Sequence, residues 1–187
     1  SWVVPTMYLW ENRLRTLDID SVLAQPEMRY VPKFISDGWI LEASTGDRPP
    51  AETAELMMEV RRRLLRALTM AGVGVLAGTD SPAVFNLPGF SLRHELRSMR
   101  AAGLTPYEVL VTATRNVAEY ARRELLENGE FGTVAEGNRA NLILLRGNPL
   151  EDLESLWSQE GVMVRGRWIP RSETDEWLQD MAERFGG

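Results

Sequence analysis

A short apolar run that ends in a glycine and a carboxylate constrains this chain most. Val73 to Ala77 are apolar, Gly78 and Thr79 follow, and Asp80 comes next, ahead of a loop rich in proline and glycine. This pattern is typical of a buried parallel strand that presents an acid at its carboxyl end, where α/β folds keep their chemistry. Asp80 is therefore a candidate metal ligand or general base.

The chain is poor in histidine and cysteine, two residues that commonly bind zinc. It has one histidine and no cysteine in 187 residues, which excludes disulfides and thiolate metal sites. A catalytic zinc takes three protein ligands and keeps one open position, so Asp80 alone cannot hold one. The lack of cysteine also fits a cytoplasmic location.

The overall composition predicts a folded globular protein with one or two domains. Hydrophobic residues make up 44% of the chain, and six of its residues are tryptophan. Such a chain can bury a core. The formal net charge of −6 disfavours a nucleic-acid partner, because binding phosphates needs a basic surface. No apolar run is long enough to span a bilayer, so no membrane partner is expected.

The first residues indicate a truncated chain. The sequence opens with Ser1-Trp2-Val3-Val4-Pro5 and has neither an initiator methionine nor the layout of a signal peptide. A β-like run at the very start suggests a piece of a longer protein, so the true N-terminus and any signal before Ser1 are not visible. A processed or engineered start is the alternative.

Short elements are predicted in the first fifty residues. Trp2 to Val4 form a strand that ends at Pro5, because proline cannot donate to a sheet. Residues 11 to 39 predict short helical turns, with Asp20 as an N-cap and Pro26 opening the next turn. Residues 44 to 50 predict a loop.

The clearest helix is predicted over residues 51 to 71. Met57, Val60, Leu64, Leu68 and Ala71 recur at three- and four-residue steps and form its apolar face. Its polar surface carries four arginines, Arg61, Arg62, Arg63 and Arg66. Such a cluster favours a solvated helix face over an anion-binding site. Gly72 ends the helix before the strand over 73 to 77.

The rest of the chain predicts helices followed by short strands. Helices are expected over 91 to 102, from 106 through 111 after a capping box at Thr105, and over 116 to 125. Short β runs then follow at 131–134, 140–145, 162–164 and 168–169, with a helical turn over 152–157. Gly166-Arg167 is a predicted hairpin turn. Ser172 should cap a last helix that buries Trp177, Met181 and Phe185.

A series of motifs in a fixed order resembles a known family. The motifs are Gly78-Thr79-Asp80-Ser81, Leu92-Arg93-His94-Glu95-Leu96, residues 102–110, 113–118, 132–137 and 140–145, Asn148-Pro149-Leu150, and residues 162–166. In this order the chain resembles the C-terminal part of the amidohydrolase superfamily, nearest its imidazolonepropionase-like and prolidase-like branch. The resemblance covers nearly the whole chain and is strongest from Gly74 to Gly166.

The resemblance implies that the chain has an α/β fold and forms the C-terminal part of a larger protein. Residues 1–128 would form the C-terminal part of a distorted (β/α)8 barrel, with strand seven at Trp2–Val4 and strand eight at Val73–Ala77. Residues 129–170 would be the C-terminal share of a small β-sandwich, and residues 171–187 a C-terminal helix.

The resemblance also assigns roles to residues near the strand end. Asp80 matches the family's strand-eight aspartate, which contacts the metal and accepts a proton from the attacking water. The alternative is that Asp80 only caps the following loop. Thr79, Ser81 and His94 would lie in the pocket or support it, with His94 in a structural or pocket-rim role. Phe85 and Leu87 form either an apolar pocket wall or the packing of their own loop.

The function that the resemblance implies belongs to a larger assembly. We expect a fragment of a metal-dependent hydrolase that cleaves C–N bonds in small amide-like substrates by a metal-activated water and is inactive alone. The cofactor would be a divalent metal, zinc by expectation, held with ligands from a missing N-terminal barrel segment or from another chain. Two strands alone would leave unpaired edges. The alternatives are a non-catalytic module that recruits a partner or forms homo-oligomers, and one chain of a split enzyme.

Overall fold

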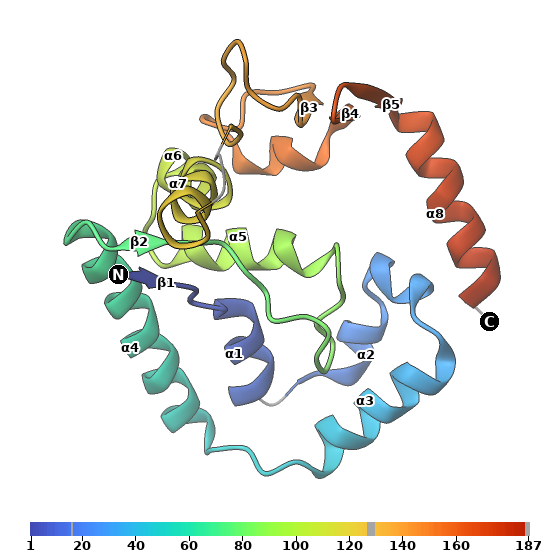
Figure 1. Ribbon diagram of the computed structural model, residues 1–187. Coiled ribbons are helices and arrows are strands. Elements are labelled where there is room, and N and C mark those ends of the chain that lie inside the picture. The colour runs from blue at the N-terminus through green and yellow to red at the C-terminus, as the bar shows by residue number, and fades with distance from the viewer. Residues whose placement is uncertain (16, 127–129, 186–187) are drawn as a thin grey trace.

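The computed structural model describes residues 1–15, 17–126 and 130–185, and it contains helices, a parallel strand pair and an antiparallel sheet (Figure 1). The helical elements are α1 (Met7–Leu14), α2 (Ile19–Leu23), the 3-10 helix η1 (Pro26–Tyr30), α3 (Lys33–Thr45), α4 (Ala51–Met70), α5 (Ser91–Ala101), α6 (Pro106–Ala113), α7 (Arg115–Glu124), the 3-10 helix η2 (Leu153–Trp157) and α8 (Arg171–Phe185). The strands are β1 (Trp2–Val3), β2 (Gly74–Val75), β3 (Leu142–Leu145), β4 (Gln159–Val164) and β5 (Arg167–Pro170). None of these helices is long and apolar enough to cross a membrane within the part of the chain that is described.

The parallel pair brings the start of the chain beside residues 74 and 75. β1 and β2 lie side by side (Figure 1), with Trp2 opposite Gly74 and Val3 opposite Val75. The N–H group of Leu76 donates to the carbonyl oxygen of Val3 at 2.9 Å. Both strands were predicted, and both are shorter than the predicted runs. Because the strands are parallel, their carboxyl ends meet at one edge.

Two glycines allow this close approach. A Cβ atom at residue 74 would overlap the ring of Trp2, and one at Gly78 would lie 2.5 Å from Cγ1 of Val4. Real Cβ atoms essentially never come so close to a neighbour. The two segments can therefore run side by side only because both positions lack a side chain.

The outer edge of β2 is covered by helices. The carbonyl oxygen of Val75 accepts a hydrogen bond from Nδ2 of Asn116 at 2.8 Å, and the N–H group of Ala77 donates to the carbonyl of Thr112 at 3.1 Å. The expectation of unpaired strand edges is therefore wrong for this part of β2. Helices α6 and α7 satisfy polar backbone groups that would otherwise be orphaned.

The core lies where α1, α4, α5 and β2 meet. Its most deeply buried side chains include Met7, Met58, Val75, Met99, Leu104 and Val109. Methionine packs well in such a place, because its unbranched side chain fills irregular gaps between helices of different direction. Burial of these side chains supplies the main driving force that holds the strand pair against the helices.

Helix α4 forms as predicted but buries another face. Ala54, Met58 and Leu65 are buried, whereas Met57, Val60 and Leu64 are exposed. Arg61 lies on the same side of the helix as these buried residues. Its guanidinium stacks 4.5 Å from the ring centre of Trp10 and donates to the carbonyl of Pro5 at 2.7 Å. The prediction that Arg61 belongs to a solvated face is wrong.

Local capping signals decide the ends of several helices. The capping box at Thr105 is confirmed: its hydroxyl accepts from the N–H of Glu108, whose carboxylate accepts from the N–H of Thr105. Pro26 opens η1 as predicted. The cap of α2 is Asp18 rather than Asp20, because only the Asp18 side chain precedes the first turn and reaches the N–H of Ser21.

The antiparallel sheet has the order β3-β4-β5. Its hairpin turn is Arg165-Gly166, where both residues have positive φ, one position before the predicted turn. Residues 131–134 form no strand, in contrast to the prediction. The chain bends within this segment at residues 132 and 133, and Gly132 has a positive φ. The predicted boundary between residues 128 and 129 lies outside the described residues.

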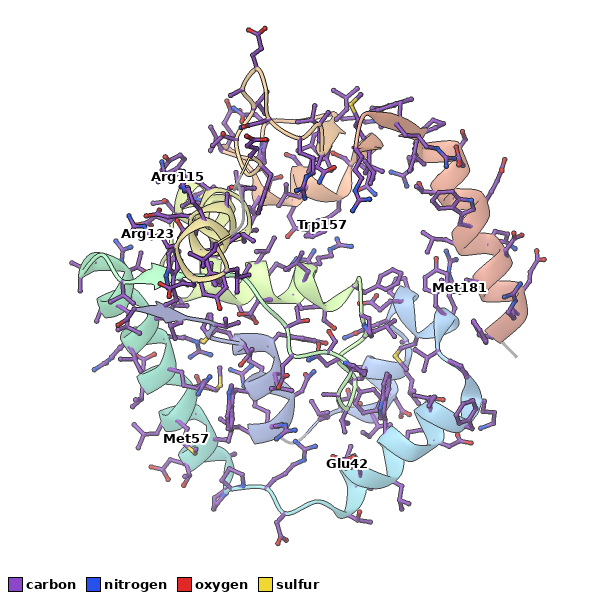
Figure 2. The ribbon with its side chains drawn as sticks, in the orientation of Figure 1. Glu42, Met57, Arg115, Arg123, Trp157 and Met181 are labelled. Carbon is purple, nitrogen blue, oxygen red and sulfur yellow. The ribbon has the colours of Figure 1, made fainter. Side chains whose placement is uncertain are left out.

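Ion pairs connect this sheet region to α5. Arg97 and Arg93 both donate to the carboxylate of Glu154 in η2. Arg93 also lies 5.3 Å from the ring centre of Trp157, and Figure 2 shows Trp157 between η2 and α5. The leucines Leu153 and Leu156 complete the contact by joining the main core.

The last helix packs less deeply than predicted. α8 begins at Arg171, so Ser172 lies inside it and is not its N-cap. Trp177, Met181 and Phe185 are between 39% and 49% exposed, and α8 has no fully buried residue. The helix leaves β5 and returns toward η1 along one side of the molecule (Figure 1), so only part of its apolar face is covered.

Candidate active site

Asp80 lies at the edge where β1 and β2 both end. It follows Val75, the last residue of β2, by five positions, and its side chain is exposed. Its φ of 55° is in the left-handed region, which few residues other than glycine adopt. Aspartate tolerates this conformation better than most side chains. The carboxylate therefore stands on a sharp turn beside the carboxyl ends of two parallel strands.

Thr79 and Ser81 flank Asp80 and contact each other. Their hydroxyl oxygens are 2.6 Å apart, so one donates to the other. The carbonyl of Thr79 accepts a hydrogen bond at 2.5 Å from Nδ2 of Asn86, which is fully buried. These contacts hold both neighbours of Asp80, and the roles that the resemblance assigns to Thr79 and Ser81 stay predictions.

The following loop is folded against α1. Figure 1 shows the loop after β2 running beside this helix. The carbonyl of Phe85 accepts from the hydroxyl of Tyr8 at 3.3 Å and from Nδ2 of Asn12 at 3.4 Å. The Phe85 ring is buried and meets Trp39 edge-on. This geometry favours a role for Phe85 in packing its own loop over a role as an apolar pocket wall.

His94 lies at a half-buried position on α5. Its Nε2 atom is 2.7 Å from Oε1 of Glu27, and its ring stacks on Tyr8 with 4.5 Å between ring centres. The hydrogen bond from His94 lowers the pKa of Glu27 below its usual range. His94 is thus paired with Glu27 and Tyr8, and its pocket-rim role stays a prediction.

Glu95 is the residue that the sequence reasoning missed. It is fully buried on α5, and its Oε2 atom accepts a hydrogen bond from the N–H of Tyr8 at 2.8 Å. Burial raises the pKa of Glu95 to about 7. The signal was present in the sequence: residue 95 falls three positions after Leu92 and four before Met99, on the apolar side of its helix.

The described residues fit a metal site only in part. Among residues 1–15, 17–126 and 130–185, no three His, Asp or Glu side chains come together where they could hold a metal ion. The Asp80 carboxylate is exposed at the strand end and can offer one oxygen ligand. Any metal there would need its other ligands from residues that the described structure does not contain.

Comparison with known proteins decides the family. Residues 47–169 match the amidohydrolase family, which is more than half of the chain. The chain belongs to the amidohydrolase family. The matched region includes β2, Asp80 and Glu95, and the resemblance noted in the sequence is therefore confirmed. No curated protein matches the chain.

Solved structures share this fold. Bottromycin amidohydrolase is 24% identical, with a TM-score of 0.74 over 99% of the chain. A Xaa-Pro dipeptidase with bound methionine is 20% identical over 91%, with a TM-score of 0.58. A prolidase in complex with N-methylphosphonate-L-proline is 25% identical over 83%, with a TM-score of 0.51. The chain spans only 34% to 40% of these three proteins.

Proposed function

We propose that this amidohydrolase chain is the C-terminal part of a hydrolase that cleaves a C–N bond in a small amide-like substrate. Asp80 is the residue that binds a divalent metal, zinc by expectation, and accepts a proton from the attacking water. The observation that carries the proposal is the position of Asp80, an exposed carboxylate at the shared carboxyl edge of two parallel strands. Active sites of α/β barrels lie at this edge.

The chemistry divides between the metal and the protein. A divalent cation supplies Lewis acidity, which lowers the pKa of water at the site to about 7 and polarises a carbonyl oxygen. The Asp80 carboxylate then takes a proton from the nucleophile and delivers it to the leaving nitrogen. The Thr79–Ser81 hydroxyl pair and the Asn86 amide hold the backbone on which Asp80 stands.

The remaining part of the barrel must come from outside this chain. In the described structure β1 pairs only with β2, and parallel sheets are normally covered on both faces. Leu56, Val60 and Leu64 of α4 are also exposed. We propose that an N-terminal segment of the same protein, or a separate chain, packs there and supplies the histidine ligands. This chain together with that segment is the intact protein.

The substrate proposal rests on the proteins that share the fold. One is a Xaa-Pro dipeptidase and another is a prolidase. A Xaa-Pro dipeptide is therefore the first substrate to test. Without the missing segment we expect no turnover, because one carboxylate cannot hold a catalytic metal. A module that binds partners without catalysis is the alternative, and the exposed apolar residues of α4 are compatible with it.

The test is a metal and activity measurement on the intact protein. We expect bound zinc, hydrolysis of an Ala-Pro dipeptide, and a loss of kcat of at least about 100-fold in Asp80→Asn, since a ligand and proton acceptor is lost. Asp180→Asn, an exposed aspartate on α8, is the matched control and should keep full activity. Undiminished turnover in Asp80→Asn would overturn the role of Asp80. A metal-free, inactive intact protein would favour the binding module.

A further inference from the structure

Glu95 is a buried acid that the proposed chemistry does not use. Its carboxylate lies between α5 and α1, where Oε2 accepts the N–H of Tyr8. The other oxygen, Oε1, is buried and has no hydrogen-bond partner among the described residues. Burying an acid costs free energy unless the group makes strong compensating contacts. A residue held at such a cost calls for a specific role.

The contact of Glu95 replaces a missing cap of α1. The residue before this helix, Thr6, has a φ of 45° and makes no capping hydrogen bond with its side chain. The first N–H groups of a helix have no partner within the helix. The Glu95 carboxylate fills this place by accepting the N–H of Tyr8, and a negative charge on it is favourable at the positive end of the helix dipole.

Glu95 thereby fixes the turn that follows β1. Its hydrogen bond joins α5 to Tyr8, and Tyr8 comes only five residues after the last residue of β1. Arg61 on α4 also holds this turn, by donating to the carbonyl of Pro5. The strand end that faces Asp80 is therefore tied to two helices through charged groups.

A continuous series of hydrogen bonds leads from this turn to Asp80. The hydroxyl of Tyr8 donates to the carbonyl of Phe85. The next residue, Asn86, donates from its side chain to the carbonyl of Thr79, which directly precedes Asp80. Ala83 and Asn86 also exchange backbone hydrogen bonds, which makes this loop a compact unit. A shift of α1 would thus move the segment that bears Asp80.

We propose that Glu95 is a positioning residue for Asp80, acting through Tyr8 and the Phe85–Asn86 loop. The proposal deepens the proposed function and rests on it for the catalytic role of Asp80. Groups that contribute binding geometry from outside the immediate ligand set commonly change activity by about 10- to 100-fold. Glu95 does not touch the reacting atoms, so its removal should lower kcat while leaving KM nearly unchanged.

Charged neighbours face Glu95 from each packed element. Glu11 on α1 raises the pKa of Glu95, Arg61 on α4 lowers it, and the N–H groups of Tyr8 and Met7 lower it. Burial is the largest effect and leaves the pKa at about 7. The contact with the Tyr8 N–H therefore favours the ionised carboxylate, while burial, the larger effect, favours the protonated one.

The experiment compares four variants of the intact protein. Glu95→Leu removes the acceptor, Glu95→Gln keeps one acceptor oxygen, and Tyr8→Phe removes only the hydroxyl that reaches Phe85. Ser98→Ala is the matched control, because Ser98 is a buried polar residue of α5 that contacts Glu11 of α1 instead of the helix N-terminus. The readouts are hydrogen–deuterium exchange of residues 79–86 and kcat and KM for an Ala-Pro dipeptide.

We expect exchange at residues 79–86 and kcat to respond together. Glu95→Leu and Tyr8→Phe should speed exchange and lower kcat about tenfold with KM within about twofold, while Glu95→Gln restores most of the activity. Ser98→Ala should change neither. If Glu95→Leu does not fold, Tyr8→Phe and Glu95→Gln decide the question.

Two results would overturn the proposal. One is faster exchange confined to α1 that does not reach residues 79–86; the other is normal kcat in Tyr8→Phe. If the unaltered intact protein does not hydrolyse the dipeptide, the proposed function fails instead. The exchange data then still decide whether Glu95 positions the Asp80 segment.

Discussion

Glu95 and Arg48 hold opposite ends of α1. The Glu95 carboxylate accepts the N–H of Tyr8 at the N-terminus of the helix. Arg48 Nη1 donates to the carbonyl oxygens of Asn12 and Arg15 at the other end, both at 2.6 Å. Each side-chain charge is opposite in sign to the end of the helix dipole that it meets. An eight-residue helix is too short to be stable by itself, so these two side chains from outside fix its position.

Removal of the C-terminal cap should destabilise the protein. Arg48→Met keeps much of the apolar stem but leaves the carbonyls of Asn12 and Arg15 without their donor. We expect the free energy of unfolding to fall by about 1–3 kcal/mol, measured by urea denaturation. Arg63→Met is the control, because Arg63 forms only an exposed pair with Glu59, and its loss should cost under about 1 kcal/mol. Equal effects of both substitutions would contradict this role of Arg48.

The buried acid should make stability depend on pH. Burial raises the pKa of Glu95 to about 7 in the folded protein, so its contribution is fully present below about pH 4 and is lost as the pH rises through 7. From this group alone, the free energy of unfolding should fall by roughly 2–3 kcal/mol between pH 5 and pH 8.

Chemical denaturation at several pH values measures this slope. Glu95→Gln cannot ionise and should flatten the profile, whereas Glu176→Gln, on the exposed face of α8, should leave it unchanged. An identical slope in unaltered protein and Glu95→Gln would show that Glu95 is not the group that titrates.

The approach of β1 to β2 should depend on Gly78. An alanine there would place its Cβ atom 2.5 Å from Cγ1 of Val4, and a β-branched side chain has little freedom to move aside. We expect Gly78→Ala to lower the free energy of unfolding by about 1–3 kcal/mol. Val4→Ala in the same chain should recover most of the loss, since it removes the clashing atom. A strictly additive double variant in urea denaturation would disprove the contact.

Features set by neighbouring residues were predictable from the sequence. The capping box at Thr105 and the glycine that ends α4 need only a few adjacent positions, and both are confirmed. The parallel strand before Asp80 was also predictable, because an apolar run that ends in Gly-Thr-Asp follows directly after a long helix. Local chemistry and order along the chain carry this information.

Features that depend on partners far along the chain were not predictable. The periodicity of α4 favours an apolar face through Met57 and Val60, but the fold turns Arg61 inward to meet Trp10 and the carbonyl of Pro5. The burial of Glu95 could be inferred from its position between Leu92 and Met99, but its partner could not, since Tyr8 lies 87 residues away. The role proposed for Asp80 depends on metal ligands that the described residues do not include.

The contact between Trp2 and Gly74 carries a consequence for how this family can vary. A side chain at residue 74 would overlap the indole ring, and that ring also meets Tyr120 edge-on and donates to Glu124. As long as Trp2 keeps this ring position, residue 74 of this chain is thus confined to glycine. An evolutionary path to a larger residue at position 74 must first shrink the aromatic side chain, and in doing so it would release the strand pair from α7.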